Sequence, residues 1–321
     1  MNNKVSCIII HHTGRLINHC LKSLEGMDIE KIIVTSDMKW KTKDTTVRVL
    51  YSKLNEPAFK RNVGALWAQG RYLCFLDDDI EVTNNCIKKM SGILDNNKYI
   101  GMVYATLYKM DNHEIIDTSG SFLSWGGFLY ETYIKRNILI TPILSSKSAC
   151  CIIRKHIFFR AGAFDDDYVI YGEETDLSWR VWQLGYKVVI RNSAIAYHAS
   201  ETSFKPQSYY NPYFIHYHGC KNYITNLLKN LPPERLYIAL LNTGIWFTMA
   251  CFMLFSNRQA SKWILQGIWY NIKNFGYIWN KRRNPVSHNY WKLVNKNPPI
   301  NYYFGRFKGY ITHKLHNQKE G

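Results

Sequence analysis

Short apolar runs and segments of helical periodicity alternate along the first hundred residues of the chain. Apolar runs of strand length are typical of buried strands, and apolar positions three and four residues apart are typical of helices. This pattern predicts strands at residues 5–10, 31–34, 47–51 and 71–76, and helices at residues 16–24, 57–69 and 84–96. Such alternation predicts an α/β fold, with a mostly parallel sheet that is covered by helices on both faces.

The next hundred residues show a mixed pattern. A stretch rich in glycine, serine and tryptophan covers residues 117–127, and an apolar segment follows at 149–154. Helical periodicity then runs over residues 173–184, where Gly185 provides a stop signal, and a further strand is predicted at 187–191. Because no internal repeat divides this region, we assign it to the same domain as the first hundred residues.

The composition changes beyond residue 203. Residues 236–257 contain no charged side chain, and this stretch of 22 residues is long enough to cross the hydrocarbon core of a bilayer. Tryptophan and isoleucine then recur at helical spacing from 263 to 275, with Lys262 and Lys273 among them, as on a helix at a membrane surface. The pattern leaves three possibilities open: a packed helical subdomain, attachment to a membrane surface, and a membrane span.

Positive charge is concentrated in the last third of the chain. The 321 residues have a formal net charge of +17. Residues 204–321 contribute +14 of it, from 16 Lys and Arg against two acids, and the first 203 residues only +3. We therefore divide the chain into a nearly neutral domain, 1–203, and a basic, aromatic-rich helical extension, 204–321. Such an extension predicts a polyanionic partner, either nucleic acid or an anionic membrane surface.

The cysteines and the first residues bear on the compartment. The eight cysteines form no C-x-x-C pair, which argues against a disulfide framework or a zinc ribbon and favours a reducing compartment. Cys7, Cys74, Cys151 and Cys251 lie within apolar runs, which predicts buried thiols. The first ten residues fit a strand better than a signal peptide. We expect a cytoplasmic protein that is attached peripherally to the inner face of the cell membrane.

Three consecutive aspartates, Asp77, Asp78 and Asp79, follow the strand predicted at 71–76. Carboxylates crowded at a strand end repel one another, and a bound cation relieves the repulsion. The carboxyl edge of a parallel sheet is also where open α/β folds bind ligands. Carboxylate oxygens suit Mg²⁺ or Mn²⁺ held jointly with the phosphates of a substrate. The triplet by itself also fits a solvated acidic turn.

A second acidic group opens the helix predicted at 173–184. Glu173, Glu174 and Asp176 complement the positive end of the helix dipole, which is one explanation for them. Glu173 and Asp176 share one helix face while Glu174 points elsewhere, so one acid can cap the helix while another faces a cleft. A carboxylate in such a cleft can act as a general base. The residues leave open which of Glu173 and Glu174 does so.

Two further side chains complete the candidate set. His198 ends a short apolar segment, and imidazole is a common metal ligand, although a lone histidine is more often structural. Arg61 lies in the segment Lys60-Arg61-Asn62 on the helix that precedes the aspartates. Its planar guanidinium can hold a diphosphate, and the alternative is a solvated helix face.

These motifs follow one another in the order found in a known enzyme family. The chain contains AFKRNVG at 58–64, AQGRYLCFLDDD at 68–79, GAFD at 162–165, YGEETDLSWR at 171–180, and His198. Residues 4 to about 200 thereby resemble the family 2 glycosyltransferases of the GT-A fold, most closely their rhamnosyltransferase-like branch. The resemblance implies a nucleotide-binding half at about 1–100 and an acceptor half at 101–203.

The resemblance also implies a role for the residues near the donor. Asp77 and Asp79 look like the outer acids of the family's DxD motif, the first near the ribose of the nucleotide and the second on the metal ion. Asp77 is also a candidate metal ligand, and Asp78, between them, is a candidate contact for the nucleotide. His198 matches a position where some members have a further metal ligand. Arg61 lies in the segment that usually lines the nucleotide site.

The remaining candidates match the acceptor side and the nucleobase. Glu174 resembles the general base of the family, with Glu173 and Asp176 orienting it. The family usually has Asp where Glu174 stands, so the carboxyl lies on a longer side chain. Asp37, after the second predicted strand, is a candidate contact for the nucleobase or the ribose.

The sequence therefore predicts a metal-dependent, inverting glycosyltransferase that uses Mg²⁺ or Mn²⁺. Its donor would be a nucleoside diphosphate sugar of UDP, dTDP or GDP, and its acceptor a hydroxyl group of a glycan or of a lipid-linked molecule. The alternatives are a nucleic-acid-binding or DNA-modifying protein that uses the basic extension, a sugar-nucleotide pyrophosphorylase, and a binding protein without activity. The acidic triplet would repel a nucleic-acid backbone, which makes the first alternative less favourable.

Overall fold

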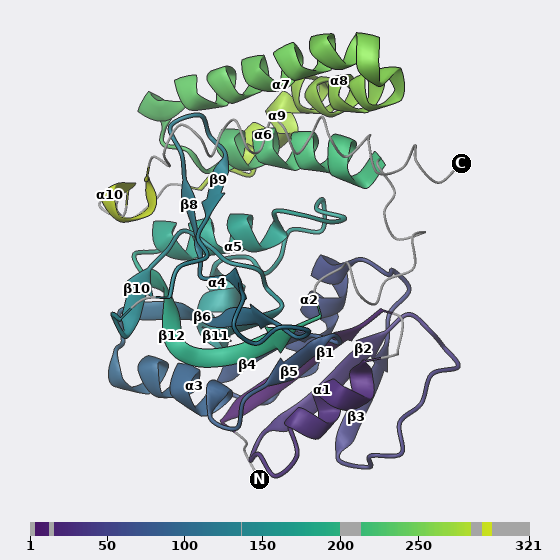
Figure 1. Ribbon diagram of the computed structural model, residues 1–321, viewed down its shortest axis with the longest axis vertical. Coiled ribbons are helices and arrows are strands. Elements are labelled where there is room, and N and C mark those ends of the chain that lie inside the picture. The colour runs from purple at the N-terminus through teal and green to yellow at the C-terminus, as the bar shows by residue number, and fades with distance from the viewer. Residues whose placement is uncertain (1–3, 13–15, 136, 200–212, 284–290, 297–321) are drawn as a thin grey trace.

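Figure 1 shows the computed structural model, which describes residues 4–12, 16–135, 137–199, 213–283 and 291–296. Most of the strands belong to one sheet, namely β1 (Val5–His11), β2 (Glu30–Thr35), β3 (Val47–Tyr51), β4 (Tyr72–Asp77), β5 (Ile80–Val82), β6 (Ile100–Lys109), β7 (Ile116–Thr118), β10 (Ile140–Pro142), β11 (Cys150–Arg154) and β12 (Lys187–His198). Within these described residues the sheet has ten strands, in the order β10-β12-β6-β11-β4-β1-β2-β3, with β5 beside β12 and β7 beside β6. A separate pair is formed by β8 (Ser121–Leu123) and β9 (Leu129–Glu131).

The central sheet is mostly parallel, as the sequence predicts. β4, β1, β2 and β3 run parallel to one another, and so do β6 and β12. β11 runs antiparallel to both β4 and β6 and therefore joins two parallel halves. The short strands β5, β7 and β10 are also antiparallel to their neighbours.

Helices cover both faces of this sheet. They are α1 (Ile17–Ser23), α2 (Pro57–Trp67), α3 (Cys86–Asn96), α4 (Lys155–Arg160) and α5 (Glu173–Gln183). α1 and α3 contribute to one buried apolar cluster, and α2, α4 and α5 contribute to the other. Every helix and strand predicted in the first hundred residues is present, so the predicted fold class is confirmed.

The strand register brings the candidate residues to one edge of the sheet. Ile10 of β1 lies opposite Asp77 of β4, and His11 lies opposite Thr35 of β2. β12 does not end at residue 191 as predicted, because a register shift between Arg191 and Ile195 carries the strand past the polar residues that interrupt its apolar run. Its last residues pair with β5, just after the three aspartates, and this pairing places His198 beside them.

The helices after residue 213 pack on the domain instead of forming a separate body. They are α6 (Gly219–Asn230), α7 (Tyr237–Ser256), α8 (Arg258–Lys273), α9 (Phe275–Asn280) and α10 (Trp291–Val294), with a π-helical turn at Phe214–His218 and a 3₁₀ turn at Pro233–Arg235. Figure 1 shows α6 between α5 and the outer pair α7 and α8. Leu227 and Leu231 share one core cluster with Leu177 and Trp179 of α5. Residues 204–212, 284–290 and 297–321 of the predicted extension lie outside the described residues.

The uncharged stretch predicted to be a packed, surface-bound or spanning segment forms α7. Pro233–Ser256, with 24 residues, a mean hydropathy of 1.8 and 39% of its apolar window buried, is long and apolar enough to cross a membrane. One side of α7 packs on the protein: the Asn242 side-chain amide donates a hydrogen bond to the Gly126 carbonyl (2.9 Å), and the indole of Trp246 is fully buried. The other side is exposed.

The state of the cysteines agrees with the prediction at all but one position. All eight lie in the described part of the chain and are free thiols. Cys7, Cys74 and Cys151 are buried as expected, but Cys251 is exposed. The prediction for Cys251 is wrong because α7 is apolar on every side, so that an apolar sequence context there does not imply burial.

Candidate active site

The three aspartates at the end of β4 point in different directions, and each meets a different group of the protein. The Asp77 carboxylate pairs with Arg61 (2.8 Å), and the Asp78 carboxylate accepts a hydrogen bond from the backbone N–H of His12 (2.7 Å). Asp79 lies 3.6 Å from the Nε2 atom of His198. The predicted crowding is therefore relieved in part by the protein itself, which corrects the expectation that a bound cation alone relieves it.

Arg61 joins the aspartates at the end of β4 to the acids of α5. One Nη atom donates to Asp77, and the other donates to Glu173 at 3.0 Å. Burial raises the pKa of Asp77, but the charge of Arg61 and other nearby positive groups outweighs it and lowers that pKa. Because both ends of its fork are occupied by carboxylates, Arg61 here holds two acids in place, whereas the sequence predicts a contact with the diphosphate. The guanidinium is 3% exposed, so the alternative of a solvated helix face is wrong.

The position of Arg61 follows from close packing of α2 on the sheet. A Cβ atom at Gly64 would lie 2.3 Å from a methyl carbon of Ile8, so only glycine lets α2 approach β1 this closely. The side chain of Asn62 exchanges two hydrogen bonds with the backbone of Phe164 (2.9 and 3.0 Å), and the Lys60 ammonium donates to the His11 carbonyl (2.6 Å). The segment therefore locks α2 to β1 and to the loop before α5.

His198 belongs to a chain of polar groups that the sequence does not reveal. Its Nδ1 atom lies 2.8 Å from Asp117, and Lys147 donates to both oxygens of the same carboxylate at 2.9 Å. Burial raises the pKa of Asp117, but the hydrogen bond from His198 and the charge of Lys147 bring it down to about 2. No motif marks Asp117, because it becomes a neighbour of His198 only through the pairing of β6 with β7 and β12. Lys147, between β10 and β11, joins this chain through its contact with Asp117.

Asp79 and His198 together fit a divalent cation. A metal-binding histidine commonly has a carboxylate on its other ring nitrogen, and Asp117 takes that place here. Within the described residues, no three His, Cys, Asp or Glu side chains come together as a complete ligand set. Two protein ligands still suit Mg²⁺ or Mn²⁺, since such ions are often held by one or two protein groups together with water and substrate phosphates.

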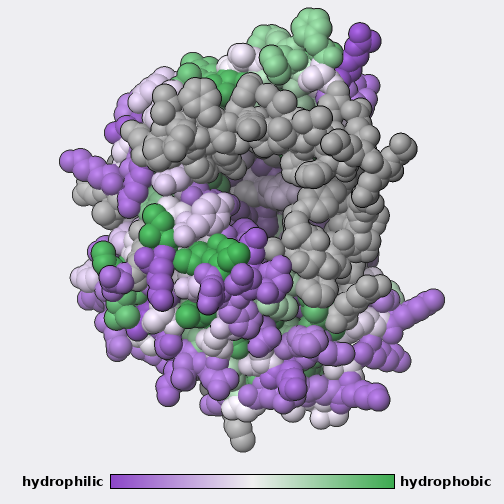
Figure 2. Space-filling model, in the orientation of Figure 1, coloured by the Kyte–Doolittle hydropathy of each residue, from purple (hydrophilic) through white to green (hydrophobic). Residues whose placement is uncertain are grey.

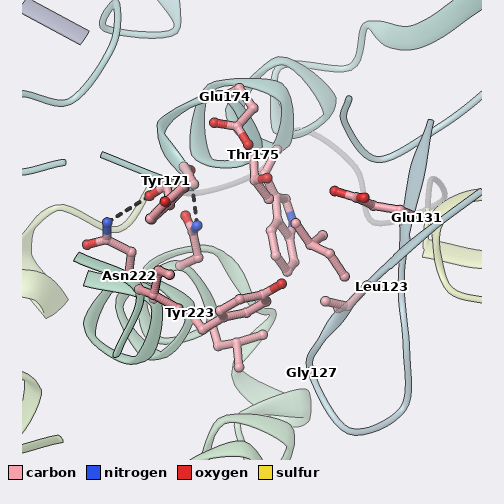
Figure 3. Close-up of a pocket in the computed structure, with 15 residues that line it drawn as sticks. Leu123, Gly127, Glu131, Tyr171, Glu174, Thr175, Asn222 and Tyr223 are labelled. Carbon is pink, nitrogen blue, oxygen red and sulfur yellow. Dashed lines mark hydrogen bonds between the residues drawn. The ribbon is translucent and has the colours of Figure 1, made fainter. Parts of the chain in front are cut away.

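Glu174 lies at the wall of a cavity between α5, α6 and the β8–β9 hairpin. The cavity has a volume of about 260 Å³. Its lining includes Leu123, Leu129, Glu131, Tyr171, Glu174, Trp179, Asn222, Tyr223 and Leu227. Burial and the charge of Glu173 raise the pKa of the Glu174 carboxyl well above its usual range. Figure 3 shows Glu174 on α5 and Glu131 on β9 at different walls of this cavity, with Tyr223 of α6 below both of them in this view.

The turn before α5 brings Glu174 to this cavity. Tyr171 and Gly172 both have positive φ angles, 66° and 85°, and a Cβ atom at Gly172 would lie 2.9 Å from the amide of Asn226. Two amide side chains of α6 fix this turn: Asn222 donates to the Tyr171 carbonyl (2.7 Å), and Asn226 donates to the Gly172 carbonyl (3.1 Å). Helix α6, which the sequence assigns to the extension, is therefore part of the site.

Asp176 does not orient Glu174, which corrects the prediction from the sequence. Its carboxylate is fully buried, and it pairs with Arg180 (2.5 Å) and with Lys229 of α6 (2.8 Å) and accepts a hydrogen bond from Asn230 (2.9 Å). Lys229 and Lys281 also pair with Asp165, at 2.6 and 2.8 Å. Part of the positive charge of the extension is therefore neutralised inside the protein, and Asp176 fastens α6 to α5.

Asp37 is exposed in the turn after β2. Its carboxylate accepts a hydrogen bond from the backbone N–H of Lys39 (2.8 Å), and its own N–H donates to Thr35 (3.0 Å). On the same sheet edge the rings of His11 and Trp40 lie 4.6 Å apart. The role of Asp37 at the nucleobase or the ribose stays a prediction.

The buried pair of Asp176 predicts a loss of stability in acid. Burial raises the pKa of Asp176, but Arg180 and Lys229 outweigh it and hold the pKa well below its usual range. The stabilisation is complete above the pKa of an unfolded aspartate, about 4, and is lost as the pH falls toward the folded value. We expect Asp176→Asn to be clearly less stable than wild type at about pH 7. The difference in stability between the two proteins should be smaller at about pH 3. The urea midpoints of both proteins at the two pH values measure this difference. A difference that is the same at both pH values would contradict the stabilising role of the Asp176 ion pairs.

The sequence of residues 33–239 matches the model of the glycosyltransferase-like family 2. The chain belongs to this family. The match to the glycosyltransferase model continues past the predicted domain boundary at 203 and includes α6, in agreement with the contribution of α6 to the cavity. Because the model describes the family as a whole, the rhamnosyltransferase-like branch stays a prediction.

Solved structures confirm that this glycosyltransferase has the GT-A fold. Residues 1–349 of TarS from S. aureus, in complex with UDP-GlcNAc, have 12% identity and a TM-score of 0.54, and the match covers 86% of this chain and 90% of that one. GalNAc-T7, crystallised with UDP, GalNAc and Mn²⁺, has 16% identity and a TM-score of 0.52, with 85% of this chain and 58% of that one covered. A search of curated protein sequences finds no match.

Proposed function

We propose that this glycosyltransferase moves a sugar from a nucleoside diphosphate donor to a hydroxyl group of an acceptor, with inversion at the anomeric carbon. The observation that carries the proposal is the position of Glu174. Its carboxyl lines a cavity, while its neighbour Glu173 is connected through Arg61 to Asp77. One guanidinium thus links the acids of the donor side to the helix that carries the base.

The similar structures support the class of donor. TarS binds UDP-GlcNAc, and GalNAc-T7 was crystallised with UDP and Mn²⁺. By analogy the donor of this enzyme is a sugar nucleotide of UDP, dTDP or GDP, with UDP the first to test. Asp79 and His198 would hold Mg²⁺ or Mn²⁺, with Asp117 fixing the imidazole. Such an ion, when bound, neutralises the negative charge that develops on the leaving diphosphate.

Glu174 accepts the proton in the proposed reaction. The acceptor oxygen bonds to the anomeric carbon on the face opposite the diphosphate, and the bond from that carbon to the phosphate oxygen breaks. Its electron pair leaves with the nucleoside diphosphate, and the hydroxyl proton passes to the Glu174 carboxylate. Because its pKa is raised, this carboxylate is a stronger base than that of a solvated glutamate. Arg61 keeps Glu173 and Asp77 in position.

The walls of the cavity suit the acceptor. Leu123, Leu129 and Leu227 provide apolar surface, and Tyr171 and Tyr223 add aromatic rings. Such walls fit the apolar faces of a sugar ring, so we propose a glycan or a lipid-linked molecule as the acceptor. A nucleic-acid partner is less favourable, because the site is lined by carboxylates and part of the positive charge nearby is already paired.

Thermal melting with sugar nucleotides tests the proposal. A ligand that binds only the folded protein raises its Tm. We expect one of the UDP, dTDP or GDP sugars to raise Tm in the presence of Mn²⁺, and EDTA to remove the effect. The same donor should release its nucleoside diphosphate on incubation, which separates an enzyme from a binding protein. No shift and no release with any of these donors would contradict the proposal.

Two variants tie this effect to the proposed metal ligands. Asp79→Asn should abolish the Mn²⁺-dependent shift. Asp117→Asn should weaken the apparent affinity for Mn²⁺ by about 10- to 100-fold, because it removes the partner that orients His198. Glu114→Gln, which removes an exposed carboxylate three residues before Asp117, is the matched control and should behave as wild type. A titration of Tm against Mn²⁺ at a fixed donor concentration measures all three.

A further inference from the structure

The outer side of α7 is apolar although it faces away from the protein. Leu240 is 75% exposed and Phe255 is 96% exposed. The exposed large apolar side chains of α7 are Tyr237, Leu240, Leu241, Ile245, Phe247, Phe252, Leu254 and Phe255. Figure 2 shows hydrophobic residues at the end of the molecule where Figure 1 places α7 and α8. Soluble proteins rarely leave a contiguous apolar patch of this kind uncovered.

Helix α8 extends this apolar face and adds positive charge to it. Leu265, Trp269 and Ile272 are exposed, and their spacing of four and three residues places them on one side of the helix. Lys262 and Lys273 are also exposed. Lys262 precedes Leu265 by three residues and Lys273 follows Trp269 by four, so both lysines lie on the same side of the helix. A helix with aromatic and aliphatic residues beside lysines is typical of a membrane interface.

A shallow groove lies where the end of α7 meets the start of α8. It has a volume of about 360 Å³, and its lining includes Leu254, Arg258, Lys262, Leu265 and Trp269. Apolar walls and two positive charges are thus combined in one groove. An anionic amphiphile has the matching chemistry, because its acyl chain contacts the walls while its phosphate meets the cations.

The cations of this face differ from those that face the protein. Lys229 and Lys281 pair with Asp165 at 2.6 and 2.8 Å. In the part of the chain that the structure describes, no carboxylate lies within ion-pair distance of Arg258, Lys262 or Lys273. Their charge is therefore available to an external anion.

We propose that α7 and α8 attach the protein, in the plane of the membrane, to an anionic phospholipid surface. The apolar side chains of α7 and Trp269 would enter the interface, with Arg258 and Lys262 at the lipid phosphates. The packing of α7 favours this orientation over a membrane span, because a span would expose Asn242 and Trp246 to lipid and break the bond to Gly126. The anionic lipids of the inner leaflet match the expected location. The proposal does not depend on the transfer reaction.

Sedimentation of the full chain with vesicles tests the proposal. We expect strong binding to vesicles of phosphatidylglycerol and phosphatidylcholine in equal parts, weaker binding to phosphatidylcholine alone, and release from the anionic vesicles at high salt. Extraction with alkaline carbonate should free the protein, as for a peripheral protein. Equal binding to both vesicles, no binding, or resistance to carbonate would each overturn the proposal.

Charge variants locate the surface. Each cation near an anionic leaflet contributes about fivefold to the binding constant, so the loss of three should weaken binding by about 100-fold. The test variant combines Arg258→Gln, Lys262→Gln and Lys273→Gln. The control removes the same charge from the opposite end of the molecule and combines Lys22→Gln, Lys88→Gln and Lys98→Gln. Equal affinity of the two variants for the anionic vesicles would overturn the proposal.

Apolar variants separate a membrane from a second copy of the chain. Leu240→Ser, Phe255→Ser and Trp269→Ser together should abolish binding to both kinds of vesicle and leave far-UV circular dichroism unchanged, since these side chains are exposed. Sedimentation velocity without lipid should give a monomer for wild type. A wild-type dimer that these substitutions dissociate, without vesicle binding, would assign the face to a second copy. Donor binding by each protein, measured by Tm, is independent of these results.

Discussion

Glu174→Gln is expected to lower kcat by about 10²- to 10⁴-fold and to leave donor binding intact. The substitution removes the proposed proton acceptor, while the amide keeps the size of the side chain. Because Glu174 lines the cavity that we propose for the acceptor, the Mn²⁺-dependent rise in Tm with the donor should be retained. Release of nucleoside diphosphate in the presence of an acceptor measures kcat.

Two other carboxylates provide controls for this prediction. Glu131→Gln removes a charge from the same cavity but from a different wall, and it should keep most of the activity. Glu173→Gln removes a partner of Arg61 and should lower both activity and stability, which separates a positioning residue from the base. A fully active Glu174→Gln, or a Glu131→Gln that is as inactive as expected for Glu174→Gln, would contradict the assignment of the base.

The sequence predicts the first half of the fold because the pattern there is local. The strand that ends in Asp77 and the helix that carries Arg61 follow from apolar runs and stop signals within ten or so residues. Parallel strands meet at their carboxyl ends, so the shared edge of β1, β2 and β4 also follows. What the pattern does not contain is direction: β11 looks like any other apolar strand, yet it runs antiparallel between two parallel halves.

The parts of the site that the sequence misses depend on contacts between distant segments. Asp117 becomes important only because β7 brings it to His198, 81 residues away. Asp176 shares the acidic motif with Glu174, but Lys229 and Asn230, more than fifty residues later, draw its carboxylate toward α6. The change in composition near residue 203 similarly assigns α6 to the extension, although α6 packs on α5 and lines the cavity. Composition cannot predict this packing, because it does not show which helices contact each other.

Arg61→Met is expected to destabilise the fold by about 3–5 kcal/mol. The guanidinium is 3% exposed, and its two partners, Asp77 and Glu173, are 25% and 8% exposed. Removing the cation leaves two neighbouring carboxylates, one of them buried, without their positive partner. The cost of removing these carboxylates from water is then no longer offset by a positive charge, and the two acids repel each other. The free energy of unfolding from urea titration measures the effect.

A matched surface pair gives the scale for this prediction. Arg48 is 43% exposed and lies 3.9 Å from Glu30, so Arg48→Met should cost no more than about 1 kcal/mol. Adding Glu173→Gln to Arg61→Met removes one of the unpaired charges and should restore part of the lost stability. Should Arg61→Met fail to fold, Arg61→Lys provides a second test, because it keeps one positive charge but not the two-pronged contact. Its free energy of unfolding should be lower than that of wild type, by less than the loss expected for Arg61→Met. If Arg61→Lys and Arg48→Met were both as stable as wild type, Arg61 would not hold the two acids together.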